Sequence, residues 1–344
     1  MKLRYLIFLV IPTYILGQGF ADMGRQVEGF EQPEKGKKFE FPIDHGPHPT
    51  FRLEWWYLTA NLKDKDGNPY GLQWTLFRTA IAPKEKLGWA SPQIWFGHAA
   101  VTTSDEHYIE ERFARGGIGL AGVASSPFNA WIDEWYMRGN TFNELKLKAA
   151  GTDFSYQMDL KTDKPLIFHG QNGYSIKSLQ GHSSYYYSQP FFSIEGTLNF
   201  LDKKVFVTGK AWLDREWSSQ PLAKNQSGWD WFSLSLETGE KVMLFSLRQT
   251  DGQEFKSGTW IFPDGKSSHI LNTDFELTPI KKSNVGGKEI PTTWRLNYPT
   301  KSLDLTVSAL NKKAWMDVSI PYWEGPVKVT GSHKGLGYLE MTGY

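Results

Sequence analysis

The sequence of 344 residues contains no cysteine. Disulfide bonds, catalysis by a thiol and a lipid anchor on a cysteine are therefore excluded. The sequence also lacks an excess of charge of either sign, because 38 Lys and Arg residues balance 37 Asp and Glu residues. No basic segment could follow a phosphate backbone, so neither nucleic acid nor an anionic lipid surface is an expected partner.

Several signatures of common enzymes and helical folds are missing as well. No long segment combines helical periodicity with good capping residues, so helices are expected only as short connectors. The glycines of Gly116-Gly117-Ile118-Gly119 lack the strand-to-helix context of a phosphate-binding loop. No Gly-x-Ser-x-Gly motif indicates a lipase. The sequence thus predicts no cofactor and gives no support to hydrolysis.

The first 21 residues are typical of a cleaved export signal. Lys2 and Arg4 precede the apolar residues 5–16, and a Gly-Phe-Ala tripeptide follows where a signal peptidase would cut. The apolar segment is shorter than the roughly 20 residues that span a membrane, which favours cleavage over an uncleaved anchor. Together with the absence of cysteine, this predicts an exported, periplasmic protein whose mature chain begins near Asp22.

Aromatic residues are abundant, with 15 Trp, 15 Tyr and 22 Phe. Aromatic side chains favour strands and are the usual lining of apolar pockets. Apolar and polar residues alternate along residues 154–161, 192–200 and 303–309, as expected for half-buried strands. Asp-Gly and Thr-Gly pairs between such segments predict hairpin turns. The sequence therefore predicts an all-β chain with antiparallel strands.

Two aromatic hairpins in the sequence resemble each other. Residues 54–58 lead through a turn to residues 72–78, and residues 229–234 lead to residues 242–248; both second strands end in arginine. A duplicated β-domain explains this echo, and chance convergence is the alternative, since strands reuse the same residue types. Closing each set of strands into a barrel would remove exposed sheet edges.

We therefore predict two calyx-like antiparallel β-barrels in tandem, joined by short helices. The predicted boundary lies near Pro190. The expected parts of the chain are a signal peptide at residues 1–21, a first barrel at residues 22–190 and a second barrel at residues 191–344.

The block from Leu213 to Ser219 places two carboxyl groups among aromatic residues after a strand-like segment. Alternation along a strand puts Asp214 and Glu216 on one face, roughly 7 Å apart, and Arg215 on the other. Two interpretations are open. The acids face an apolar cavity as proton donors, or Arg215 or another basic group neutralises them at a barrel rim.

Three blocks of the sequence carry a family resemblance: residues 44–57, with Asp-His-Gly-Pro-His-Pro and Arg-Leu-Glu-Trp-Trp-Tyr; residues 211–220, Ala-Trp-Leu-Asp-Arg-Glu-Trp-Ser-Ser-Gln; and residues 337–344, Gly-Tyr-Leu-Glu-Met-Thr-Gly-Tyr. Together they resemble the AttH-like and CrtC-like proteins, which include the carotenoid 1,2-hydratases, also called hydroxyneurosporene synthases. The resemblance implies a pair of lipocalin-like (calycin) barrels and an apolar ligand. In the hydratases it implies cofactor-free addition of water to the terminal double bond of an acyclic carotenoid.

The resemblance matches Asp214 to the proposed acid of the hydratases. Hydration of an alkene needs an acid that protonates carbon, a site that tolerates the cation, and a base that holds water. Neighbouring tryptophans are expected to raise the pKa of Asp214 by desolvation and to face the cation. The predicted catalytic residues are Asp214, Glu216 and Asp230, and the predicted ligand-binding residues are Trp55, Trp56, Tyr57, Trp74, His98, Trp212, Trp217, Trp229 and Trp231.

Asp44, His45 and His48 have the residue types of a metal site, but the intervening Gly46-Pro47 makes a turn rather than the spacing that ligands usually use. We predict no metal, and expect this segment to cap the open end of the first barrel, with its imidazoles bonded to backbone there.

Three hypotheses for the function follow. The first is a periplasmic protein that binds a long apolar molecule, a lipid or isoprenoid, in one or both barrels. The second is a cofactor-free hydratase of the carotenoid 1,2-hydratase type that uses Asp214 as its acid. The third, which rests on the resemblance, is an accessory component of an ABC transporter, with the permease as partner.

Overall fold

The computed structural model describes residues 28–344 apart from 221 and 224. The predicted signal peptide therefore lies outside the described residues. Within these residues the regular structure is almost entirely strand, with three short 3-10 helices: η2 (Ile43–His45), η3 (Gly88–Ala90) and η4 (Pro299–Lys301). In the described part of the chain, no helix is both long and apolar enough to cross a membrane.

The first sheet is antiparallel and has 13 strands in the order β4-β3-β2-β1-β13-β12-β9-β8-β7-β6-β5, with β10 and β11 also paired to β12. Its strands are β1 (Leu53–Lys63), β2 (Pro69–Ala80), β3 (Gln93–Thr102), β4 (His107–Arg115), β5 (Ala121–Ser125), β6 (Phe128–Ile132), β7 (Trp135–Thr141), β8 (Glu144–Ala150), β9 (Phe154–Lys161), β10 (Ile167–Phe168), β11 (Tyr174–Ile176), β12 (Ser183–Phe200) and β13 (Lys204–Ser218).

The second sheet is antiparallel and has ten strands in the order β17-β16-β15-β14-β23-β22-β20-β19-β18, with β21 paired to β22. Its strands are β14 (Gln226–Leu236), β15 (Lys241–Gln249), β16 (Glu254–Ile261), β17 (Ser267–Ile270), β18 (Glu276–Val285), β19 (Lys288–Tyr298), β20 (Leu303–Ala309), β21 (Trp315–Met316), β22 (Tyr322–Gly331) and β23 (Gly335–Met341).

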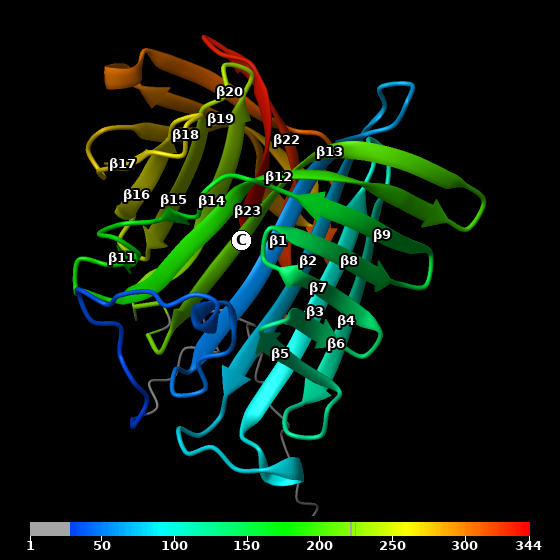
Figure 1. Cartoon of the computed structure of the whole chain (residues 1–344). Coiled ribbons are helices and arrows are strands. Elements are labelled where there is room, and N and C mark those ends of the chain that lie inside the picture. The colour runs from blue at the N-terminus through cyan, green and yellow to red at the C-terminus, as the bar shows by residue number, and fades with distance from the viewer. Residues whose placement is uncertain (1–27, 221, 224) are drawn as a thin grey trace, which may run out of the picture.

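The two sheets share one strand order, which supports the predicted duplication. In each, the first strand of the unit pairs with its last strand: β1 with β13, and β14 with β23. Outward from these pairs, β2, β3 and β4 match β15, β16 and β17 in order. Each sheet curls around its own core, and Figure 1 shows the two barrels side by side, the second in yellow-green to red. The prediction of two tandem barrels is confirmed.

The predicted boundary near Pro190 does not coincide with the change of sheet. Pro190 lies within β12, where the pairing with β13 shifts register between Gln189 and Phe192. Such an irregularity tolerates proline, which has no N–H to donate to a ladder. Both β12 and β13 stay in the first sheet as far as Ser218, and the second sheet begins only at Gln226.

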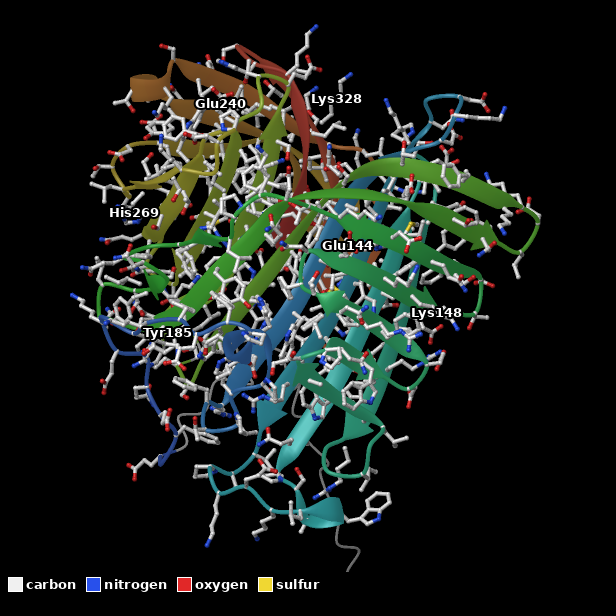
Figure 2. All side chains as sticks on the ribbon, in the orientation of Figure 1. Glu144, Lys148, Tyr185, Glu240, His269 and Lys328 are labelled. Atoms are coloured by element: carbon white, nitrogen blue, oxygen red, sulfur yellow. The ribbon has the colours of Figure 1, made fainter. Side chains whose placement is uncertain are left out.

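Side chains alternate between the inside and the outside of each barrel. On β8, Leu145 and Leu147 are buried in the first core, whereas Glu144 and Lys148, labelled in Figure 2, lie on the other face of the strand. The interior of the first barrel is filled by large side chains such as Trp56, Trp74 and Trp135, and that of the second by residues such as Phe232 and Trp323.

A third apolar cluster lies between the barrels. It is formed by outward-facing residues of both sheets, where β1 contacts β23 and β2 contacts β22. Its buried members include Tyr57, Tyr186, Trp212, Trp231 and Phe245. The two barrels thus share an aromatic interface, because the strands that open and close each unit carry apolar residues on both faces.

Candidate functional site

A cavity of about 160 Å³ lies at this interface. Its walls come from β1, β2, β3, β12 and β13 of the first sheet and from β14, β15 and β23 of the second, and most of the lining is apolar. We expected the ligand to lie inside a barrel. The structure places the cavity outside both, because the face of β13 that carries Asp214 and Glu216 points toward the second sheet. Four acidic residues line it: Glu54, Asp214, Glu216 and Glu340.

Asp214 is almost fully buried in the wall of this cavity, with 2% of its surface exposed. Its Oδ1 accepts hydrogen bonds from the Ser188 hydroxyl and from Trp212 Nε1, the latter at 2.7 Å, and the Tyr186 hydroxyl also bonds the carboxyl. Burial nevertheless raises the pKa of Asp214 to about 7, with a smaller contribution from Glu216. Since Ser188 and Trp212 both donate to Oδ1, Oδ2 is the oxygen left to carry the acidic proton.

A buried chain of hydrogen bonds holds Ser188 in place behind Asp214. His169 Nε2 lies 2.5 Å from the Ser188 hydroxyl, and His169 Nδ1 lies 2.8 Å from Thr259 Oγ1. Burial keeps the pKa of His169 well below its usual value, so the imidazole is neutral. Because Ser188 donates to Asp214, it accepts from Nε2–H, and the Thr259 hydroxyl donates to Nδ1. This order of donors fixes the orientation of the Asp214 carboxyl.

Glu216 lies on the same cavity wall in a different electrostatic setting. Its Oε1 accepts a hydrogen bond from the Ser184 hydroxyl at 2.5 Å and forms an ion pair with Lys177 Nζ at 2.8 Å. The two acids therefore differ in their partners, although both face the cavity. Lys177 neutralises Glu216, whereas Asp214 forms no salt bridge within the described residues.

Glu340 was not among the residues predicted from the sequence. It faces Asp214 and Glu216 from the second barrel, is half-buried, and accepts a hydrogen bond from Trp229 Nε1 at 2.6 Å. Burial raises the pKa of Glu340 to about 7. Glu340 lies opposite Trp231 across β14 and β23, as Glu216 lies opposite Trp55 across β1 and β13. A comparison of the last strands of the two units, in addition to the two similar hairpins, would have identified Glu340 from the sequence.

Six of the predicted site residues line the cavity: Asp214, Glu216, Trp55, Tyr57, Trp229 and Trp231. Asp230 does not, because it occupies the opposite face of β14. It points into the second barrel, where it pairs with Arg248 Nη1 at 2.5 Å and accepts a hydrogen bond from the Tyr344 hydroxyl at 2.9 Å. Asp230 is adjacent in sequence to Trp229 and Trp231, which line the cavity. Neighbouring residues of a strand point to opposite faces, so this adjacency did not place Asp230 at the site.

The remaining predicted residues do not line the cavity. Trp56, Trp74 and Trp217 are buried in the core of the first barrel. Trp212 lies behind the cavity wall and reaches Asp214 through its indole N–H. His98 is fully buried at the contact between the barrels.

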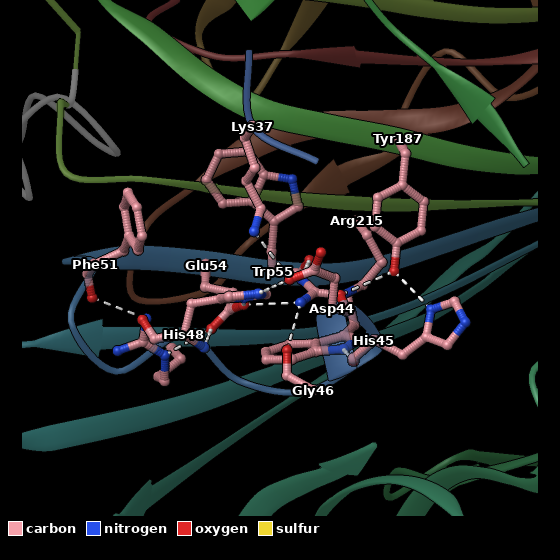
Figure 3. A network of polar contacts seen from close by, with 12 residues as sticks. Lys37, Asp44, His45, Gly46, His48, Phe51, Glu54, Trp55, Tyr187 and Arg215 are labelled. Atoms are coloured by element: carbon pink, nitrogen blue, oxygen red, sulfur yellow. Dashed lines mark hydrogen bonds and ion pairs between the residues drawn. The ribbon is translucent and has the colours of Figure 1, made fainter. Parts of the chain in front are cut away.

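The segment around η2 caps the first barrel through side-chain contacts, as Figure 3 shows. His48 bonds Glu54 through Nδ1 at 2.6 Å and Asp44 through Nε2 at 3.0 Å, and His45 Nδ1 lies 2.7 Å from the Tyr187 hydroxyl. The imidazoles therefore bond side chains rather than backbone. Within the described residues, no group of three or more His, Cys, Asp or Glu side chains is arranged to hold a metal ion.

Glu54 lies at the centre of this capping network, inside the first barrel. Its carboxylate bonds Arg78 Nε at 2.9 Å and Arg215 Nη2 at 2.7 Å in addition to His48. Arg215 also stacks over the Trp56 ring at 3.9 Å. Burial opposes ionisation of Glu54, but these cations outweigh it and hold its pKa far below the usual value. Arg215 therefore forms its ion pair with Glu54, whereas Asp214 and Glu216 lie on the other face of β13.

The raised pKa of Asp214 predicts a pH-dependent stability difference between the wild type and Asp214→Asn. A carboxyl with a raised pKa binds a proton in the folded state that it loses on unfolding. Its stabilising contribution is thus complete below about pH 4 and lost as the pH rises through about 7. Urea unfolding at several pH values should show the wild type losing about 1 kcal/mol per pH unit relative to the variant in this window. A constant difference would contradict the assigned pKa.

The profile of the AttH-like family matches residues 32–344. Among solved structures, the chain is similar to a protein assigned as AttH from Nitrosomonas europaea, with 30% identity and a TM-score of 0.82 over 92% of this chain and 100% of that one. It also shares its fold with kievitone hydratase from Nectria haematococca, with 13% identity and a TM-score of 0.68 over 92% of this chain and 97% of that one. No curated protein matches the sequence. Since the family match spans nearly the whole described chain, the protein belongs to the AttH-like family.

Proposed function

We propose that the cavity between the barrels is the active site of a cofactor-free hydratase that acts on a mostly apolar, unsaturated molecule. The observation that carries this proposal is Asp214, a buried acid with a pKa of about 7 in an aromatic wall. A general acid works best when its pKa is near the working pH. A site that only held a hydrocarbon would gain nothing from the buried carboxyl groups of Asp214, Glu216 and Glu340, since burying a polar group costs free energy.

The first step is protonation of the double bond. Asp214 transfers the proton on Oδ2 to one alkene carbon, the π electrons form the new C–H bond, and the other carbon becomes a cation. The rings of Trp55, Trp231 and Phe245 line the cavity and present apolar and π surfaces to this cation. The hydrogen bonds from Ser188 and Trp212 to Oδ1 stabilise the carboxylate that Asp214 becomes.

The second step is the addition of water to the cation. Glu340, whose pKa of about 7 suits a base, takes one proton from the water as its oxygen bonds to carbon. The product is an alcohol. The overall reaction adds one water molecule to the alkene and needs no cofactor. Asp214 is then ionised and Glu340 protonated, so one proton must return to Asp214 before the next turnover.

The size and neighbours of the cavity indicate the class of substrate. A dry cavity of about 150 Å³ accommodates benzene, so the cavity here fits one short branched end of a longer molecule. A long isoprenoid would extend beyond it. The structural relative named a hydratase supports the addition of water as the reaction.

A second candidate function is storage or transfer of an apolar ligand without turnover. The mostly apolar lining of the cavity favours it. Lys177 and Glu216 would then bind a polar end of the ligand. Export to the periplasm and a permease partner stay predictions from the sequence and the resemblance.

Turnover in labelled water separates the two functions. The purified protein would be incubated with acyclic isoprenoids, including an acyclic carotenoid, in water enriched in heavy oxygen, and all bound and released compounds identified by mass spectrometry. A hydratase yields an alcohol that carries the heavy oxygen. Recovery of every bound compound unchanged would overturn the hydratase and favour the carrier.

A further inference from the structure

We infer that a chain of hydrogen-bonded side chains conducts protons between the cavity and the protein surface. It crosses the contact between the barrels and, apart from Glu340, uses groups that the proposed reaction does not employ. Its members, from the cavity outward, are Glu340, Tyr57, Glu324, Tyr322, His98 and Glu111.

The inner half of the chain alternates carboxyl and phenol groups. The Tyr57 hydroxyl bonds the cavity carboxyl Glu340 and donates to Glu324 Oε1 at 2.5 Å. Glu324 is 1% exposed and does not line the cavity. The Tyr322 hydroxyl, two residues earlier on the same face of β22, lies beside the Glu324 carboxyl, whose Oε2 has no hydrogen-bond partner within the described residues.

The outer half of the chain reaches the surface through an imidazole. The Tyr322 hydroxyl lies 3.0 Å from His98 Nδ1, and His98 Nε2 lies 3.1 Å from Glu111 Oε1. His98 is fully buried, whereas the side chain of Glu111 is 17% exposed and accepts hydrogen bonds from the Ser319 backbone N–H and hydroxyl. Glu111 is therefore the point at which the chain meets solvent.

The donors in this chain all point the same way. Tyr57 donates to Glu324, Tyr322 donates to His98 Nδ1, and His98 Nε2–H donates to Glu111. Glu324 Oε1 accepts from Tyr57, so the proton of this carboxyl belongs on Oε2, which has no partner within the described residues. When this O–H turns toward the Tyr322 hydroxyl, one concerted shift moves a proton from Glu340 to Glu111. Each O–H or N–H bond along the way breaks as the next forms, and no intermediate group ends with a charge.

The charge states of the members fit this requirement. Burial raises the pKa of Glu324 well above its usual value, so its carboxyl is neutral and holds a proton. Burial lowers the pKa of His98, so its imidazole is neutral and leaves one nitrogen to accept. Burial opposes ionisation of Glu111, but hydrogen bonds from His98 and Ser319 outweigh it and hold its pKa below the usual value, so Glu111 is an ionised carboxylate that passes a proton on to solvent.

A purely structural role explains the chain less well. Apolar residues would join two barrels at least as firmly, because buried polar groups recover in hydrogen bonds little more than they lose in desolvation. A proton path has a use once an apolar substrate displaces water from the cavity, since Glu340 must then release its proton by another route. This use rests on the proposed function, but proton exchange along the chain can be measured without a substrate.

Exchange at Glu324 tests the path, because this carboxyl touches neither solvent nor the cavity. The protein would be mixed rapidly into heavy water, and the carboxylic acid band that Glu324→Gln lacks would be followed by infrared spectroscopy. Tyr57→Phe should leave exchange open from the surface, and His98→Phe should leave it open from the cavity. The double variant should slow exchange by about a hundredfold or more, because a local opening of the structure is then required.

His107→Phe is the matched control. His107 is another histidine of the first sheet at this contact, where it approaches the Met316 sulfur at 3.4 Å, but it is not in the chain. Its exchange rate should equal that of the wild type. Tyr322→Phe replaces His98→Phe if the latter fails to fold, as judged by thermal unfolding.

The path is overturned if the double variant exchanges as fast as the wild type, if either single variant is as slow as the double variant, or if His107→Phe slows exchange equally. The outcome is independent of the reaction. If Glu324 exchanges from both the cavity and the surface but no compound is hydrated, the proton path stands and the hydratase proposal fails. If a compound is hydrated but the exchange results contradict the path, the hydratase proposal stands and the path fails.

Discussion

Replacing Glu54 with glutamine is expected to lower the free energy of unfolding by about 3–5 kcal/mol. Glu54 is 1% exposed and its carboxylate bonds Arg78, Arg215 and His48. Glutamine keeps the volume but removes the charge, which leaves two buried guanidinium groups without their shared counter-ion. Urea unfolding of the wild type and the variant at neutral pH measures the difference.

Asp304→Asn is the control for this prediction. Asp304 pairs with Arg295 through two bonds of 2.8 Å, but both side chains are more than half exposed. Removing an exposed ion pair costs about 0–1 kcal/mol. Equal losses in Glu54→Gln and Asp304→Asn would show that the network around Glu54 does not hold the cap of the first barrel in place.

Asp214→Asn is expected to lower the rate of hydration by about 10²–10⁴-fold, the usual contribution of a general acid, with little change in the affinity for the ligand. The amide keeps the shape of the side chain and its contacts with Ser188 and Trp212, but has no acidic proton to give. Initial rates and direct binding of the same compound would be measured side by side.

Asp159→Asn provides the comparison, since Asp159 is an exposed aspartate of β9 that pairs with Lys146. Its rate should match that of the wild type. If Asp214→Asn retained the full rate, Asp214 would be only a polar contact in a binding site. If it lost ligand affinity in proportion to rate, Asp214 would bind the substrate rather than protonate it.

The duplication explains how two barrels build one site. Each unit places a tryptophan on its first strand opposite a glutamate on its last: Trp55 with Glu216, and Trp231 with Glu340. The two units face each other, so the cavity lies between two surfaces that each carry a tryptophan and a glutamate. The pair has diverged, because Lys177 neutralises Glu216 whereas burial raises the pKa of Glu340.

The sequence by itself determined the properties that depend on neighbouring residues. Period-two alternation predicted strands and placed Asp214 and Glu216 on one face with Arg215 on the other, and the structure has the two acids in one cavity and Arg215 inside the barrel. The hairpin echo predicted two units, and the three conspicuous blocks pointed to the family. All of these are local patterns, which a strand retains wherever it lies in the fold.

Only the tertiary structure decided which face of each strand points into a barrel and which strands meet across the interface. These outcomes place the cavity between the barrels, bring Glu340 to Asp214, turn Asp230 away and align His98 with Glu324. They depend on contacts between residues far apart in the sequence. Alternation defines two faces of a strand but not which is inside, because closure and packing of the whole sheet make that choice.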